Sequence, residues 1–196
     1  MKIILASTNA GKLQELQASL AVLNITLIPQ RDLELKDADE TAVTFIENAL
    51  IKARHACVQT GLPAIADDSG LCVPALQGAP GVNSSRYSGG SDQDNIKKLL
   101  KAMQGLKESA RDAFFHCVLV YLACATDPAP YVCHGMWRGS ILEEAVGDSG
   151  FGYDPIFYVP THRVSASQLS ITQKNEISHR GKALQQFISQ WSLLKG

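Results

Sequence analysis

An almost unbroken apolar run from Ala113 to Ala125 is the feature that most limits how this chain can fold. The run is rich in Phe and Val and lacks the regular alternation of a strand with one solvated face. We therefore expect a central β-strand that is covered on both faces. The segment Tyr131–Ile141 is predicted to pair beside it, after a turn marked by Pro128 and Pro130. Strands that need such cover imply a sheet with packed helices, in an α/β or α+β arrangement.

Shorter elements are predicted around these two strands. No linker divides the chain, so we expect a single domain over residues 1–196. The helix after Thr44 should carry Ala49, Ala53 and Cys57 in an apolar stripe, with Asn48, Lys52 and His55 on the opposite, polar face. Strands are expected at Lys2–Ala6, Ile25–Ile28 and Leu62–Ala66. Helices should begin at Gly11, at the capping box Thr44–Glu47, at Ser91 and near Ser178. Loops are expected at Asp32–Thr41 and Pro74–Gly90.

The bulk properties exclude several classes of protein. The formal net charge is −1, so no general attraction to nucleic acid or to an anionic membrane is expected. The apolar start of the chain is too short for a signal peptide, and no stretch approaches membrane-spanning length. The 5 cysteines form no C-x-x-C pair, are odd in number and lie mainly among apolar neighbours, as reduced buried thiols do. We predict a cytoplasmic protein.

The segment Ala66–Leu71 carries two adjacent carboxylates, Asp67 and Asp68, directly after an apolar run. Neighbouring residues on a strand point to opposite faces, so the two aspartates are expected to have different roles. Acidic side chains at a strand end suit Mg²⁺, which takes carboxylate and phosphate oxygens as ligands. The alternative is a turn, because Asp, Ser and Gly are common turn formers.

Two further segments are candidates for contact with phosphate or metal. Ser7–Glu15 joins the first strand to the first helix, and a helix N-terminus with Lys12 in its first turn can bind an anion. The alternative is a capped helix with an exposed lysine. Glu40 closes the acidic loop and could be a second metal ligand with Asp68, or a solvated loop acid.

The second half of the chain holds two candidates for contact with a ligand. In the glycine-rich segment Gly147–Pro155, Phe151 could stack on a nucleobase or anchor the loop to the core. Its Gly-Asp-Ser-Gly start matches part of the nucleophile loop of trypsin-like proteases, but the following Gly-Pro and a disulfide framework are absent. Lys174 and the segment Ser178–Lys182 are basic at a helix start, which indicates an anionic ligand or an ordinary Ser cap.

These segments occur together in a specific order: Ser7–Glu15, Phe45–Ala49, Ala66–Leu71, Ala79–Gly81, Ser84–Gly89, Gly150–Pro155 and Ser178–Gly181. In this order and spacing the chain resembles the inosine triphosphate pyrophosphatase family, the dITP/XTP pyrophosphatases. The resemblance implies an α/β fold with an elongated mixed central β-sheet and helices, and two lobes around a nucleotide-binding cleft. It also implies a homodimer and Mg²⁺-dependent hydrolysis of dITP, ITP and XTP to the monophosphate and pyrophosphate.

The resemblance also implies roles for individual residues. Asp68 is the expected catalytic base and, with Glu40, the expected metal ligand. Lys52 is a further candidate to hold the leaving pyrophosphate. The residues expected to hold the triphosphate are Ser7, Thr8, Asn9, Ala10, Gly11 and Lys12, and those expected to bind the rest of the nucleotide are Ser69, Phe151, Gly152, Tyr153, Asp154, Lys174, His179 and Arg180.

Two other functions fit part of this pattern. A nucleotide-binding regulator would keep the phosphate loop but would not need Asp67, Asp68 and Glu40. A pyrophosphatase acting on pyrimidine or modified nucleotides would keep the acidic residues, whereas the Ser178–Arg180 cluster favours purines through the resemblance alone.

Overall fold

The computed structural model describes residues 1–7 and 9–194, so Thr8, one of the predicted triphosphate-binding residues, lies outside the described residues. The helices are α1 (Ala10–Leu20), α2 (Phe45–Thr60), α3 (Asp92–Ala102), α4 (Ile171–Ile177) and α5 (His179–Leu194). The strands are β1 (Lys2–Leu5), β2 (Thr26–Pro29), β3 (Ala64–Cys72), β4 (Asp112–Leu122), β5 (Tyr131–Ile141), β6 (Phe157–Val159) and β7 (Val164–Ser165). Every helix among these residues is too short or too polar to span a lipid bilayer.

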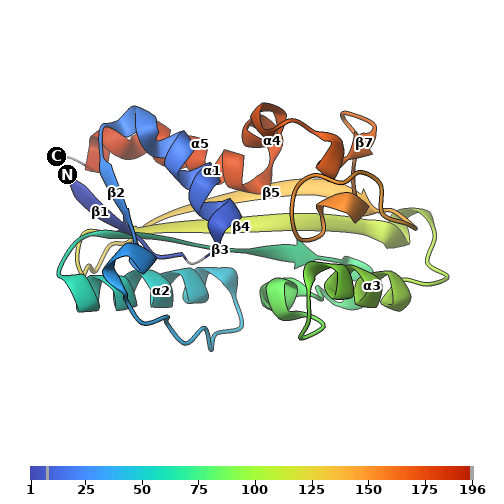
Figure 1. Cartoon of the computed structure of the whole chain (residues 1–196), viewed down its shortest axis with the longest axis horizontal. Coiled ribbons are helices and arrows are strands. Elements are labelled where there is room, and N and C mark those ends of the chain that lie inside the picture. Colours follow the sequence, from blue (N-terminus) through green and yellow to red (C-terminus); the bar gives the residue numbers. More distant parts are fainter. Residues whose placement is uncertain (8, 195–196) are drawn as a thin grey trace. The chain divides into compact units, whose positions relative to one another are not determined.

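The described strands form one mixed sheet in the order β2-β1-β3-β4-β5-β6-β7 (Figure 1). Strand β1 runs parallel to β2 and β3, with Ile4 opposite both Ile28 and Ala64. Strand β6 is antiparallel to both of its neighbours. The prediction that Tyr131–Ile141 pairs beside the long apolar strand is confirmed, and so is the α/β class with a mixed sheet.

The chain divides into two compact units, each with its own core. The first unit comprises Met1–Asp68, Cys117–Gly135 and the chain from Arg180 on, and the second comprises Ser69–His116 and Met136–His179. Strand β3 therefore passes from one unit to the other between its second aspartate and Ser69. A single domain and a nucleotide-binding cleft between two lobes stay predictions.

The first unit has a core on each face of its strands. Figure 1 shows α1 and α5 on one face and α2 on the other. Leu16 of α1 and Phe187 of α5 pack with Ile3 and Leu119 on one face, while alanines of α2 pack with Ile4 and Val120 on the other. Small alanines let the helix backbone approach the strands closely, which brings α2 beside the sheet. The long run of β4 is apolar because both of its faces are covered, as predicted.

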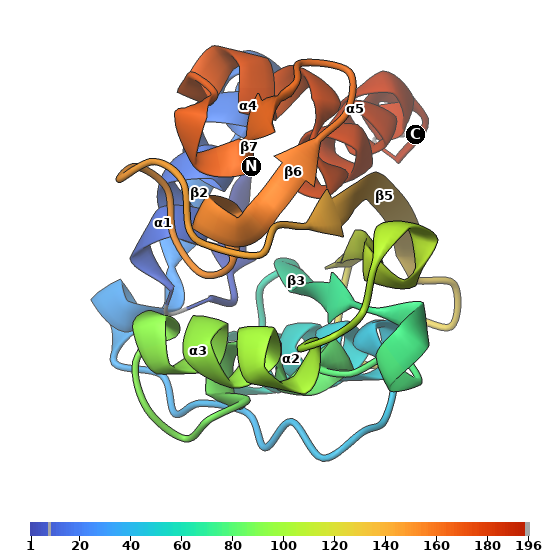
Figure 2. The same ribbon diagram turned by 90° about the vertical axis from the view of Figure 1, so that its right-hand side faces the viewer.

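The second unit has one core built around aromatic residues. Leu99 of α3, Phe115 of β4, Trp137 of β5 and Phe157 of β6 belong to it. Figure 2 shows α3 on one side of this unit and α4, with β6 and β7, on the other. The short elements β6, β7 and α4 are absent from the sequence-based prediction, because segments of two to seven residues are too short for a hydrophobic period to emerge.

Strand β3 differs from its prediction. It was expected to end at Ala66, but it continues through both aspartates to Cys72. The local turn preference of Asp, Ser and Gly is overridden by tertiary contacts. Leu71 is buried in the second core and its N–H donates to Ser84 Oγ at 2.8 Å. The expected exposed loop Pro74–Gly90 is therefore tied to the strand through Ser84, which is itself buried.

Candidate active site

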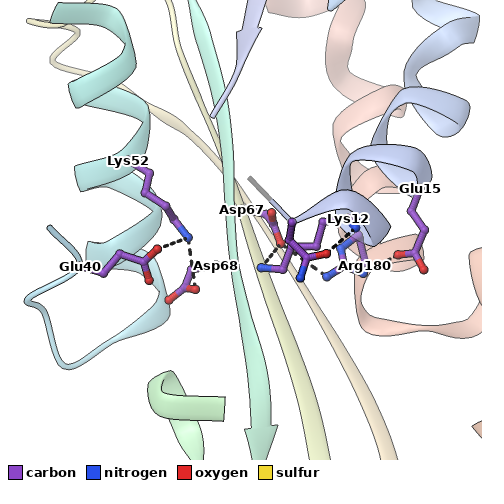
Figure 3. A network of polar contacts seen from close by, with 8 residues as sticks. Lys12, Glu15, Glu40, Lys52, Asp67, Asp68 and Arg180 are labelled. Atoms are coloured by element: carbon purple, nitrogen blue, oxygen red, sulfur yellow. Dashed lines mark hydrogen bonds and ion pairs between the residues drawn. The ribbon is translucent and has the colours of Figure 1, made fainter. Parts of the chain in front are cut away.

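The two adjacent aspartates of β3 lie on opposite faces of the strand. Figure 3 shows Asp68 beside Glu40 and Lys52 on one side of β3, and Asp67 beside Lys12 and Arg180 on the other. Both side chains are almost fully buried. The strand alternation that predicted different roles for the two residues is confirmed.

On the first face, one lysine bridges two carboxylates. Lys52 Nζ lies 3.2 Å from Glu40 Oε1 and 3.4 Å from Asp68 Oδ1. Glu40 comes from the loop before α2, Lys52 from α2 and Asp68 from β3, so three segments converge on one point. Glu40 is therefore part of a built cluster rather than a solvated loop acid.

The loop that carries Glu40 is held in place by α2. The buried amide of Asn48 accepts from Ala42 N–H at 3.0 Å and donates to Ala42 C=O at 3.3 Å. About three helical turns further along α2, Gln59 makes the same pair of bonds to the backbone of Lys36, at 3.1 Å each. Asn48 was predicted on the polar face of this helix, and the structure shows that its side chain is buried there. Its side chain can be buried because it forms hydrogen bonds with the backbone N–H and C=O of Ala42 in place of another backbone segment.

Burial and neighbouring charges have opposite effects on the pKa values of Asp68 and Lys52. Burial raises the pKa of Asp68, and the attraction of Lys52 and Lys12 only partly offsets that effect. For Lys52, burial alone would lower the pKa, but attraction to Asp68, Asp67 and Glu40 outweighs it and raises the pKa. The lysine is therefore firmly cationic, and its charge holds the two carboxylates together.

The donor set of this cluster fits Mg²⁺. Glu40 and Asp68 offer carboxylate oxygens that already converge on one positive charge. Mg²⁺ is commonly bound by one or two carboxylates together with substrate phosphates and waters. Within residues 1–7 and 9–194 no group of three or more His, Cys, Asp or Glu side chains could hold a metal ion. The two carboxylates of this cluster match the number that Mg²⁺ commonly takes from a protein beside phosphate oxygens.

On the second face, Asp67 is the centre of a buried ion network. Its Oδ2 lies 3.0 Å from Lys12 Nζ and 3.6 Å from Arg180 Nη2, and Arg180 Nη1 also donates to Glu15 (Figure 3). Burial would raise the pKa of Asp67, but Lys12, Arg180 and Lys52 hold it well below its usual range. Burial would likewise lower the pKa of Arg180, and Asp67, Cys117 and Glu15 raise it instead. The network is ionised and joins β3 to α1 and α5.

The start of α1 has the geometry expected of an anion site. Asn9 is the N-cap, and its side chain accepts from Lys12 N–H at 3.0 Å. Ala10 and Gly11 are the first two helical residues, and Ser7 follows the end of β1. The first turn contains no acidic residue, so no carboxylate of the helix offsets the positive end of its dipole, while Lys12 Nζ is paired with Asp67.

In the second unit, the glycine-rich segment presents Phe151 at the surface, with 37% of the residue exposed. Lys174 Nζ lies 5.2 Å from the centre of the Phe151 ring and donates to Asp154 Oδ2 at 2.7 Å. Asp154 Oδ2 also accepts from Phe151 N–H at 3.0 Å. Phe151, Asp154 and Lys174, predicted as nucleotide-binding residues, thus form one cluster.

Other predicted residues have contacts within the fold. The hydroxyl of Tyr153 is buried and donates to Ser84 C=O at 2.8 Å. The ring of His179 stacks on Phe115, with centres 4.7 Å apart and planes inclined by 10°. Ser69 is half-buried on β3, and the N–H of Gly152 donates to Asp92 Oδ2 at 2.8 Å. The substrate contacts of these residues stay predictions.

Two partners in these networks were not assigned by the sequence analysis. Glu15 has no predicted role, although it lies in the segment Ser7–Glu15, and no partner is predicted for Asp67. Strand alternation could have placed Asp67 on the α1 face, beside the cation of Lys12. Its pairing with Arg180 has no local signal, because more than a hundred residues separate them.

An α/β chain with converging carboxylates and a lysine at a helix N-terminus has the parts of an enzyme that acts on phosphate anions. Comparison with known proteins agrees: a model of the Ham1 family matches residues 3–190, and the chain belongs to that family. A protein of Idiomarina loihiensis named dITP/XTP pyrophosphatase is 57% identical over 194 residues, 96% of each chain. One of Coxiella burnetii with the same name is 53% identical over 188 residues, 95% of this chain and 94% of that one.

Solved structures are similar over the whole length. A HAM1 protein from Coxiella burnetii has a TM-score of 0.92 and 50% identity, with 100% of each chain covered. The Staphylococcus aureus Ham1 protein has a TM-score of 0.88 and 37% identity, with 98% of each chain covered. Fold and sequence therefore agree on the family.

Proposed function

We propose that this protein hydrolyses the deaminated purine nucleoside triphosphates dITP, ITP and XTP to the monophosphate and pyrophosphate. The reaction removes these nucleotides from the pool and prevents their incorporation into DNA and RNA. The observation that carries the proposal is the convergence of Glu40 and Asp68 on one cation. The names of relatives that are more than half identical over nearly the full chain support the choice of substrate.

Glu40 and Asp68 would hold Mg²⁺, in agreement with their donor chemistry. The bound ion would neutralise negative charge on the phosphates and on the leaving pyrophosphate. Lys52 lies between the two carboxylates and is cationic, so it would contribute charge to the same phosphates. Lys12, at the N-terminus of α1, would bind phosphate oxygens together with the backbone N–H groups of that helix turn.

Asp68 would act as the general base. Its carboxylate would orient a water for in-line attack on the α-phosphorus and accept the proton as the P–O bond to pyrophosphate breaks. Burial makes this carboxylate more basic than an exposed aspartate, which suits the task. Asp67 forms ion pairs with Lys12 and Arg180 on the other face of the strand and would not act as the base.

Selection of the base has a simple physical explanation. Hypoxanthine and xanthine carry an acceptor oxygen at C6, where adenine carries an amino donor. Guanine shares this oxygen, so the rejection of GTP would act at its 2-amino group. A pocket that offers hydrogen-bond donors from Arg180, His179 or backbone N–H groups would leave the adenine amino group without an acceptor. Phe151 would stack on the base.

The first test is pyrophosphate release from ITP, dITP, XTP, ATP, GTP and dTTP, with Mg²⁺ and with a chelator. We expect Mg²⁺-dependent release from the first three and at least about a hundredfold less from the others. Release mainly from dTTP would reject the base assignment and favour a pyrimidine pyrophosphatase. Nucleotide binding without any release of pyrophosphate would indicate a nucleotide-binding regulator instead of an enzyme.

A homodimer and a cytoplasmic location belong to the same proposal. The dimer rests on the resemblance to the family, and the location rests on the cysteine pattern. Light scattering of the purified protein should give about twice the 21.2 kDa mass of one chain. A mass of one chain at micromolar concentration would reject the dimer.

A further inference from the structure

The loop that presents Phe151 is held at its base by the fold of the second unit. The carbonyl of Val146 accepts from the hydroxyls of Ser165 and Ser167 at 2.6 and 2.8 Å, and its N–H donates to Pro155 C=O at 2.8 Å. The two ends of the loop are therefore joined to each other and to the segment after β7. Hydrogen bonds at the base alone do not fix the orientation of a side chain at the tip.

The two peptide groups that flank Phe151 are each held by a carboxylate. The N–H of Phe151 donates to Asp154 Oδ2 at 3.0 Å, within the loop. The N–H of Gly152 donates to Asp92 Oδ2 at 2.8 Å, 60 residues away in sequence. Because one bond fixes the peptide before Phe151 and the other fixes the peptide after it, the backbone dihedrals of Phe151 are restrained from both sides. The close fit of Asp154 also requires glycine at position 150, where a Cβ would overlap its carboxylate.

Asp92 is not needed to cap its own helix. It is the first residue of α3, and the capping box there is formed by Ser91 and Asp94. Its carboxylate is favoured by the positive end of the helix dipole and bonds outside the helix, to the loop. Asp92 is exposed, so this bond contributes little to the core of the unit.

We propose that Asp92 is a positioning residue: by holding the Gly152 N–H, it sets the orientation of Phe151 for stacking on the base of the nucleotide. The inference rests on the proposed function and extends it to a residue of α3 that does not touch the substrate. A ring that is already oriented loses less conformational freedom when a base stacks on it, so the bond from Gly152 to Asp92 favours base binding.

The test compares Asp92→Ala with Asp92→Asn, which keeps an acceptor oxygen, and with Asp94→Ala, which damages the same helix start without touching the loop. Calorimetry measures the affinity for inosine monophosphate, which carries the base, and for inorganic pyrophosphate, which does not. Asp92→Ala should weaken monophosphate binding about fivefold and leave pyrophosphate binding unchanged. Asp92→Asn should restore most of the affinity, and Asp94→Ala should leave both affinities unchanged.

A double-mutant cycle with Phe151→Leu separates positioning from a general effect. If Asp92 acts through the ring, adding Asp92→Ala to Phe151→Leu should cause little further loss of monophosphate affinity. Fully additive losses, or equal losses for monophosphate and pyrophosphate, would overturn the inference.

Hydrogen exchange gives a readout that does not depend on the activity. The amide of Gly152 should exchange faster in Asp92→Ala than in Asp94→Ala. Unchanged exchange would reject the inference even for an active enzyme. A wild-type protein that hydrolyses none of the deaminated nucleotides would reject the proposed function, whatever the exchange shows.

Discussion

Replacing Asp68 by Asn should lower the kcat for ITP hydrolysis by about a thousandfold or more, because the amide cannot accept the proton of the attacking water. The substitution keeps the size of the side chain, and Lys52 keeps Glu40 as a partner at 3.2 Å. The free energy of unfolding should therefore change by less than about 1 kcal/mol. Pyrophosphate release at saturating ITP and Mg²⁺ gives the rate, and chemical denaturation gives the stability.

The control for Asp68→Asn is Asp32→Asn, which removes an exposed acid from the same half of the chain. It should leave the kcat unchanged. A kcat for Asp68→Asn within tenfold of the wild type would show that another group accepts the proton, and the assignment of the base would be wrong.

Replacing Asp67 by Asn should lower the free energy of unfolding by about 3 kcal/mol, because Arg180 is buried and would lose one of its two carboxylate partners. For a chain of this size, that loss corresponds to a fall of about 6–12 °C in Tm. The shape of the side chain is kept, so the loss reports the missing charge rather than a cavity. Thermal unfolding followed by circular dichroism measures the effect.

Asp68→Asn is the matched control for this stability measurement, since the two residues are adjacent, buried and acidic. We expect Asp67→Asn to reduce mainly the free energy of unfolding and Asp68→Asn to reduce mainly the kcat. Equal Tm values for the two variants would contradict the division of roles between the faces of β3.

Helices and strands with a clear periodicity of apolar residues, or with a long apolar run, could be predicted from the sequence. Residues Tyr131–Ile141 of β5 and the capped start of α3 have the predicted bounds, because pairing with β4 and the Ser91–Asp94 box are encoded locally. The extension of β3 to Cys72 was not predictable in this way. Its residues favour a turn, and the strand is stabilised by contacts with distant segments.

The same division applies to the candidate site. Side chains of suitable chemistry, such as Glu40 and Asp68, were identified from residue type and resemblance, and the structure brings those two together around Lys52. The residues that hold these side chains in place were not identified from the sequence. The helical period placed Asn48 on the polar face of α2. It could not show that the side chain binds the loop before α2, because the period of a helix contains no information on the path of that loop.

The alternation of β3 also constrains the length of the chain. Because side chains change face at every residue, inserting or deleting one residue between Ala64 and Asp67 would exchange the two carboxylates. Asp68 would then lie on the face of Arg180, and Asp67 on the face of Glu40. Substitutions in this strand alter one face at a time, whereas a change of one residue in its length would remove both the ion network and the carboxylate pair at once.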